Sequence, residues 1–101
     1  MTPRQVLSDK LHAVMGQHKV YFQPPETVKL TYPCIVYNME PPLQKYADNF
    51  TYFAMQKYSG VLIDPDADST FYPGLLGIEH LRISRIYRAD GLYHFAFDVY
   101  I

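Results

Sequence analysis

The sequence predicts one α+β domain spanning residues 1–101, with two helices packed on one face of a mostly antiparallel sheet, in the order α-β-β-β-α-β-β. Three observations lead to this fold class. The chain opens with apolar residues at helical spacing. Several later runs are rich in β-branched and aromatic residues, which favour strands. Asp90-Gly91 separates the last two of these runs, and this dipeptide is a strong hairpin signal.

Residues 2–16 are predicted to form the first helix. Thr2 is a capping residue, Pro3 suits the first helical position, and Gln5 completes a capping-box pattern. Gly16 can end the helix in a left-handed turn. The apolar stripe that would face the core comprises Val6, Leu7, Leu11, Val14 and Met15.

Two short strands are expected next. Residues 19–22 form the first, and Pro24-Pro25 ends it because proline fixes φ and lacks a backbone donor. Residues 33–39 form the second, and Pro41-Pro42 is expected to stop it in the same way.

A long third strand is predicted in the middle of the chain. Residues 43–50 before it are interpreted as a loop, with a turn at Asp48-Asn49. Residues 51–64 form the strand itself. Within it, Gly60 indicates either a bulge or a close approach of the backbone to another group.

A second helix and a closing hairpin complete the predicted fold. The helix is expected from about residue 69 to residue 81, and Asp68 or Ser69 would cap it. Residues 82–89 and 92–101 form the two strands of the hairpin.

Three aspartates alternate before the second helix, as they would in a calcium-binding loop: Asp64, Asp66 and Asp68. A loop of the EF-hand type that begins at Asp64 needs glycine at its sixth position and glutamate at its twelfth. Those positions hold Ser69 and Leu75. The stretch is therefore interpreted as a turn followed by a helix cap, and no metal site is predicted.

Cys34 is the single cysteine, which excludes an internal disulfide and fits a reducing compartment. It lies between Pro33 and Ile35, where a cysteine is usually a small inert core residue. A small cytosolic enzyme that uses Cys34 as a nucleophile beside a histidine stays an alternative of another class. The available histidines are His12, His18, His80 and His94. Because metal-ligand spacings, nucleophile elbows and glycine-rich phosphate motifs are missing, we predict no catalytic residue and no cofactor.

A net charge of −1 provides no basic field that would attract nucleic acid or anionic lipid. No apolar run reaches the roughly 20 residues of a membrane helix, and the first residues lack the apolar core of a signal peptide. A domain assembled in the cytosol, without membrane contact, is therefore expected.

The best candidates for contacts with nucleic acid are Arg82, Arg85 and Arg88. In a regular strand, Arg82 and Arg88 would share one face and Arg85 would lie on the other. Solvated strand arginines are the simpler interpretation, and a nucleic-acid binder stays an alternative.

Aromatic usage is skewed, with ten tyrosines and six phenylalanines against no tryptophan. One small core cannot enclose all these rings, so some of them must lie on the surface. Exposed aromatic residues on strands are typical of interfaces. Rings half-buried over a sheet edge explain them equally well.

Five motifs follow one another along the chain: VYFQPP (20–25), YPCIVY (32–37), YADN (46–49), LIDPDADS (62–69) and RIYRADGLYHFAFDVYI (85–101). Together they resemble the small tail-completion or tail-terminator proteins of long-tailed bacteriophages and prophages, the head–tail joining group. The resemblance covers nearly the whole chain after the first helix.

This resemblance implies a structural virion protein of the tail or neck, assembled in the cytoplasm of the bacterial host. Its copies would form a homo-oligomeric ring, commonly of six subunits, on the end of the tail tube. The ring would stop polymerisation of the tail-tube protein and present a surface to the head–tail connector or stopper, while genomic DNA only passes through the lumen. A head-closure (stopper) protein that binds the connector is the alternative that the motifs leave open.

A ring needs a heterologous interface, in which one patch meets a different patch on the next copy. The 40–50 loop and the 51–64 strand are the candidates for contact with a neighbouring copy or with the tube. The residues expected in this interface are Tyr46, Phe50, Tyr52 and Phe53.

Overall fold

The computed structural model describes residues 2–47 and 50–101, and the side chains of residues 43–54 lie outside the description. The elements follow in the order α1 (Pro3–Met15), β1 (Lys19–Phe22), β2 (Cys34–Ala47), β3 (Phe50–Asp64), α2 (Tyr72–Leu76), β4 (Leu81–Ala89) and β5 (Leu92–Tyr100). The α+β class and the element order predicted from the sequence are confirmed.

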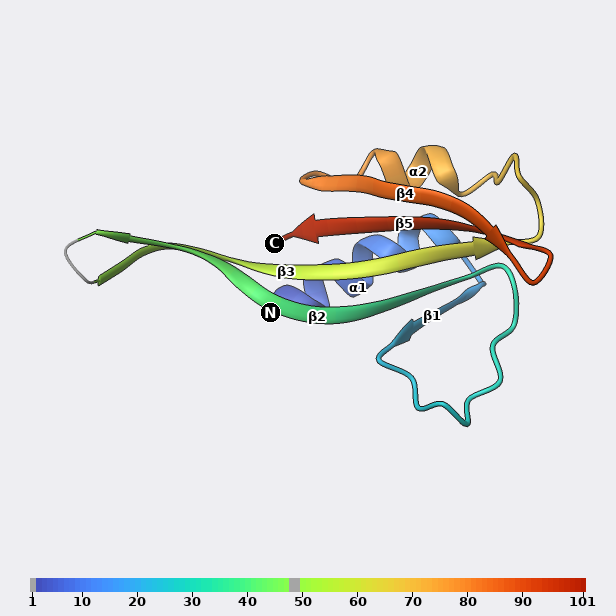
Figure 1. The fold of residues 1–101 in the computed structure, drawn as a ribbon, viewed down its shortest axis with the longest axis horizontal. Helices are drawn as coiled ribbons and strands as arrows, with labels where there is room; N and C mark the ends of the chain where they lie inside the picture. The colour runs from blue at the N-terminus through green and yellow to red at the C-terminus, as the bar shows by residue number, and fades with distance from the viewer. Residues whose placement is uncertain (1, 48–49) are drawn as a thin grey trace.

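The five strands form one mixed sheet in the order β1-β2-β3-β5-β4 (Figure 1). β1 pairs with β2 in parallel, and the other three pairs are antiparallel. Both helices lie on the same side of the sheet, where their buried residues join one apolar cluster with β2, β3 and β5. The opposite side of the sheet carries neither helix.

Helix α1 begins where the capping pattern predicts. The Thr2 hydroxyl accepts a hydrogen bond from the Gln5 amide at 3.2 Å, and the Gln5 side chain accepts one from the Thr2 amide at 2.8 Å. These reciprocal bonds satisfy two donors that the first turn leaves free. The face that meets the sheet is fully apolar, and its buried residues are Leu7, Leu11 and Met15.

The core centres on aromatic residues that face the helices. Tyr37, Tyr58 and Phe97 are each about as buried as a residue can be, at 1% exposure. Gly60 lies directly opposite Tyr37 and Phe97 in the sheet, and the ring of Phe97 occupies the space above it. The sequence left a bulge or a close approach as alternatives for Gly60. The close approach is correct, because Gly60 pairs regularly with both neighbouring strands.

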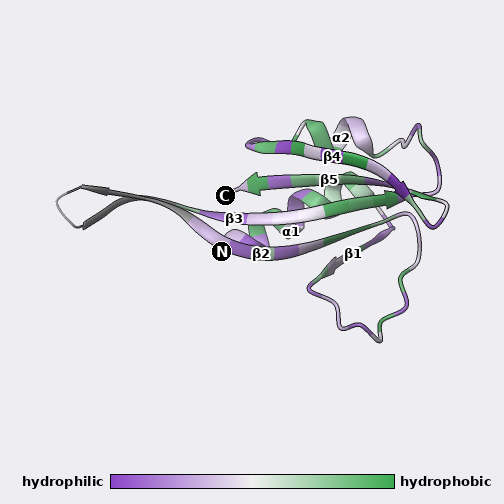
Figure 2. Cartoon of the chain, in the orientation of Figure 1, coloured by the Kyte–Doolittle hydropathy of each residue, from purple (hydrophilic) through white to green (hydrophobic). Residues whose placement is uncertain are grey.

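Near its end, β3 carries a short continuous hydrophobic run over residues 61–63 (Figure 2). Leu62 faces the helices, while Ile63 faces the other side of the sheet and is still only 6% exposed. Both sides of the sheet are apolar at this end of the molecule. This explains why the strand does not alternate between apolar and polar residues there.

The predicted loop over residues 43–50 is wrong, because β2 continues to Ala47 and β3 begins at Phe50. Pro41-Pro42 does not stop β2; the strand passes through it with a shift of register between Glu40 and Leu43. β1 pairs with β2 only as far as Tyr37. The prolines therefore lie where the outer edge of β2 has no neighbouring strand, and the irregularity absorbs their missing donors. The proposed turn at Asp48-Asn49 lies outside the described residues.

The second helix is much shorter than predicted, covering Tyr72–Leu76 instead of residues 69–81. Its first flanking residue is Phe71, which makes no side-chain cap, so the predicted cap at Asp68 or Ser69 is also wrong. Local side-chain bonds in the preceding segment hold that segment in turns. Gly74 and Gly77 lower the helix propensity of the residues after those turns.

The closing hairpin has the predicted position and turn. Asp90 and Gly91 both have positive φ, at 54° and 76°, as a two-residue turn between antiparallel strands requires. β5 then runs back through the sheet between β3 and β4.

Candidate interaction surfaces

The most prominent feature of the molecule is a two-stranded arm that projects from one end of the sheet (Figure 1). The arm consists of residues 43–47 of β2 and 50–55 of β3, which pair only with each other. The contact between β3 and β5 begins at the backbone bonds that join Gln56 to Ile101. The arm accounts for much of the length of the molecule, whose extents are 50 × 27 × 24 Å.

All the residues expected from the sequence to form an interface belong to the strands of this arm: Tyr46, Phe50, Tyr52 and Phe53. Their side chains lie outside the description, so only the position of their backbone can be compared with the predicted interface. An isolated two-stranded hairpin is at best marginally stable in water. An arm rich in aromatic residues is therefore expected to need a covering surface.

A groove of about 550 Å³ lies at the opposite end of the molecule, on the helix side of β4 and β5. Its lining includes Asp68, Ser69, Tyr72, Ile86, Tyr93 and Phe95; we call it the Ile86 groove. Ile86 is 51% exposed. The turns before α2 and the first residues of α2 form one side of the groove, and β4 and β5 form the other.

Two of the three aspartates before α2 bind backbone amides with their side chains. The Asp64 carboxylate accepts a hydrogen bond from the Asp66 amide at 2.8 Å, and the Asp66 carboxylate accepts one from the Asp68 amide at 2.9 Å. The Ser69 hydroxyl accepts a bond from the Phe71 amide at 3.2 Å. These bonds form consecutive turns that build one wall of the Ile86 groove. Within residues 2–47 and 50–101, no three His, Cys, Asp or Glu side chains are grouped to hold a metal ion.

The side of the sheet without helices is ordered in three rows of cross-strand neighbours. From β2 to β4 they are Cys34–Ile63–His94–Tyr87, Val36–Val61–Ala96–Arg85 and Asn38–Ser59–Asp98–Arg82. Short side chains in the second and third rows leave a shallow hollow of about 260 Å³. This face therefore changes from apolar to polar across the rows.

The predicted distribution of the arginines is wrong. Arg82 and Arg85 share the helix-free side of the sheet, because their cross-strand partners Asp98 and Ala96 share that side. Arg88 pairs with Tyr93 and lies on the other side. The cause is a bulge between Ile83 and Arg85, which inserts one residue and reverses the alternation after it.

An aromatic stack lies on the helix-free side of the sheet beside these arginines. The rings of Tyr87 and His94 are stacked, with centroids 4.7 Å apart and planes 9° apart. The Arg85 guanidinium lies over Tyr87 at 4.3 Å. Such contacts fix the direction of Arg85 along the sheet. Sequence reasoning missed this cluster because it depends on the bulge.

Cys34 lies in the first row and is completely buried. Burial raises the pKa of its thiol to about 11, so the thiolate that a nucleophile needs is scarce at neutral pH. The histidine in the same row, His94, is two strands away with Ile63 between them, a backbone separation of about 10 Å. The described geometry does not place a base within hydrogen-bond reach of the thiol.

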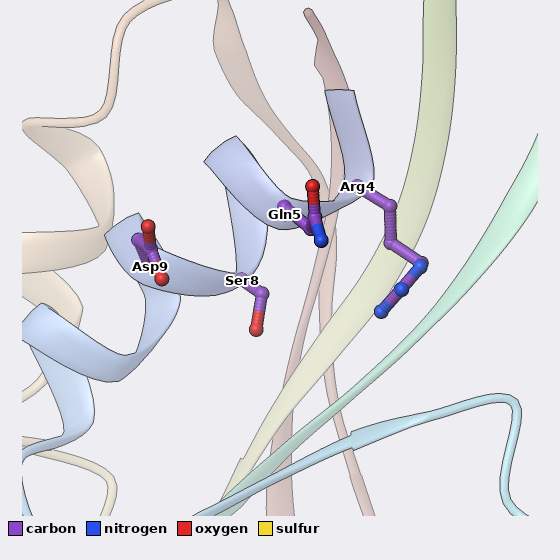
Figure 3. A pocket seen from close by; sticks show the side chains of 4 residues that line it. All are labelled: Arg4, Gln5, Ser8 and Asp9. Atoms are coloured by element: carbon purple, nitrogen blue, oxygen red, sulfur yellow. The ribbon is translucent and has the colours of Figure 1, made fainter. Parts of the chain in front are cut away.

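A further hollow of about 450 Å³ lies beside the first turns of α1 (Figure 3). Arg4 extends from the helix over the sheet, with its guanidinium 5.2 Å from the centre of the Phe22 ring. Gln5 is engaged in the capping box, and the Ser8 hydroxyl lies 3.3 Å from Nδ1 of His12. Gln5 and Ser8 thus bind groups of the helix itself, while Arg4 contacts β1.

Comparison with known proteins identifies no relative: neither a protein-family model nor a curated protein matches this sequence. Among the residues that the structure describes, neither helix has the length and apolar character to cross a bilayer.

Proposed function

We propose that this chain is a structural virion protein of a tailed phage or prophage, a tail terminator or tail-completion protein that forms a ring, caps the tail tube and joins tail to head. The observation that carries the proposal is the projecting arm. Its strands hold the aromatic residues that the sequence analysis expects in the contact between copies. A protein that works as one subunit of a ring needs two unlike, complementary surfaces, and a projecting arm can supply one of them.

The proposed mechanism is capping by unlike surfaces. One side of the ring binds the last ring of tail-tube protein in the position of the next layer. The other side differs chemically, so no further tube subunit adds, and this side binds the connector or stopper. No reactive group takes part, which accords with the buried, weakly acidic thiol of Cys34.

Two alanine substitutions in the arm test the proposal. Tyr52→Ala combined with Phe53→Ala should give a protein that folds but forms no rings, because interfaces depend on a few aromatic anchors. Circular dichroism checks folding, and native mass spectrometry with and without tail tubes measures assembly. Val28→Ala combined with Leu76→Ala is the matched control, since both side chains are exposed apolar groups outside the arm. If the arm variant still forms rings, the arm is not the interface.

The terminator and stopper roles make different predictions for the partner. A terminator ring should be retained by immobilised tail-tube protein, whereas a head-closure protein should be retained by the connector and not by the tube. Binding to the connector alone would replace the tail-terminator role with the stopper role.

A further inference from the structure

We propose that the arm of one copy docks in the Ile86 groove of the next copy, so that these two surfaces form the subunit interface. This inference rests on the proposed ring and names the surface that receives the arm. The position, chemistry and size of the two surfaces support it.

The positions of the arm and the groove favour contact between copies. They lie at opposite ends of the long axis (Figure 1), which measures 50 Å. Six residues of strand beyond Gln56 reach only about 20 Å, and they extend away from the groove. An arm therefore cannot fill the groove of its own chain. A contact between unlike ends is heterologous, and repeating it generates a ring when the rotation closes.

The chemistry of the two surfaces is complementary. The arm sequence is mainly apolar and contains four aromatic residues. The groove exposes Ile86 beside the rings of Tyr93 and Phe95, and the Tyr72 ring lies tilted against Phe95 with centroids 4.9 Å apart. Aromatic groups gain most when they enter apolar pockets that exclude water. The groove volume of about 550 Å³ is in the range of pockets that enclose a compact ligand.

The available area also suits a stable interface. A buried aromatic side chain removes about 150–250 Å² from water, so four of them supply roughly 600–1,000 Å². A standard interface buries about 800 Å² on each partner. Burial of all four would thus supply the area that one side of a subunit contact requires.

Complementation between two defective variants tests this pairing directly. The arm variant carries Tyr52→Ala and Phe53→Ala and keeps its groove, while the groove variant carries Ile86→Glu and keeps its arm. Each variant alone should stay monomeric at concentrations at which the wild type assembles. The protein concentration needed for half-assembly should be about tenfold higher or more than for the wild type. A mixture should give a one-to-one heterodimer in native mass spectrometry but no closed ring, because only one intact arm meets one intact groove.

Leu76→Glu is the matched control for the groove variant. Leu76 is 50% exposed, almost the same as Ile86, but lies on α2 outside the groove lining. It should assemble like the wild type. Rings formed by the Ile86→Glu protein, or a mixture of folded variants without heterodimers, would overturn the pairing while leaving the proposed ring intact. A wild-type chain that stays monomeric with and without tail tubes would refute both.

Cysteine cross-linking keeps the inference testable if Ile86→Glu does not fold. Tyr52→Cys and Phe53→Cys place a thiol at two successive positions of β3 within the arm. One of them should form a disulfide with Ile86→Cys on a differently tagged copy, and neither should do so with Leu76→Cys. The native Cys34 is buried and should not compete. If rings form and neither arm cysteine links to position 86, the proposed docking is wrong.

Discussion

Gly60 lies in β3 beneath the ring of Phe97, and its replacement by alanine tests how tightly the core is packed. A Cβ at position 60 would lie 2.5 Å from Phe97 Cζ, 3.0 Å from Phe97 Cε2 and 3.0 Å from Tyr37 Cβ. Carbon atoms in favourable contact are about 3.5–4.0 Å apart. Because Phe97 and Tyr37 are each only 1% exposed, neither can retreat into solvent, and the added methyl group must displace the core.

The expected cost is the balance of two opposing contributions. Forcing an extra methyl group into a packed core costs about 1–3 kcal/mol. Removing the flexibility of glycine from the unfolded chain restores about 0.4–1 kcal/mol. We therefore expect Gly60→Ala to lower the free energy of unfolding by about 1–2 kcal/mol, which corresponds to a fall in Tm of roughly 4–16 °C for a domain of this size.

Urea denaturation followed by far-ultraviolet circular dichroism measures this change, since the chain has no tryptophan for fluorescence. Gly77→Ala is the control: its Cβ would meet nothing closer than 3.4 Å, and the change should stay within about 0.5 kcal/mol. Phe97→Leu should relieve part of the clash, so the double variant should lose less stability than the two single losses combined. A Gly60→Ala protein as stable as the wild type would refute the packing argument.

Two further predictions concern Cys34 and the closing turn. Burial raises the pKa of Cys34 from 9.0 to about 11, so its contribution to stability is complete below pH 9 and falls by about 3 kcal/mol as the pH rises through 11. The stability difference between wild type and Cys34→Ala, from urea titrations at several pH values, should shrink over that window; a constant difference would contradict it. Gly91 has φ +76° with open space around it, so Gly91→Ala should cost about 1–2 kcal/mol through backbone strain alone. Thermal unfolding of Gly91→Ala, with Gly77→Ala as the control, measures this cost. Equal Tm values for the two variants would count against the prediction.

Parts of the fold could be predicted because, in those parts, the structure that the local residues favour is the same as the structure that tertiary packing requires. The capping box at Thr2, the apolar stripe of α1 and the turn at Asp90-Gly91 each specify a backbone geometry from a few neighbouring residues. Gly60 was recognisable as a special position, although its cause, the ring of Phe97, lies on another strand.

The failed predictions share one physical origin, which is that the effect of a residue depends on the strands beside it. Pro41-Pro42 would end a central strand, but β2 has no outer neighbour at that point. Its strand character therefore depends on pairing with β3, which the local sequence does not reveal. Likewise, the aspartates before α2 bond to nearby amides, so they form turns where helix capping was expected.

The candidate site was predictable only in outline. The aromatic residues of the arm could be assigned to an interface from the excess of tyrosine and phenylalanine and from the resemblance. The Ile86 groove could not, because it depends on how the turns before α2 pack beside the paired strands β4 and β5. This packing has no local sequence pattern.

The irregularity between Ile83 and Arg85 gives β4 one position at which a change in chain length should be harmless. Ser84 is the extra residue there, so removing it would join Ile83 to Arg85 in regular alternation, and the residues on both sides would keep their cross-strand partners. Removing a regularly paired residue of β4 would instead move every residue on one side of the deletion to the opposite face of the sheet. The strand should thus tolerate the loss of this serine far more readily than the loss of any of its paired neighbours.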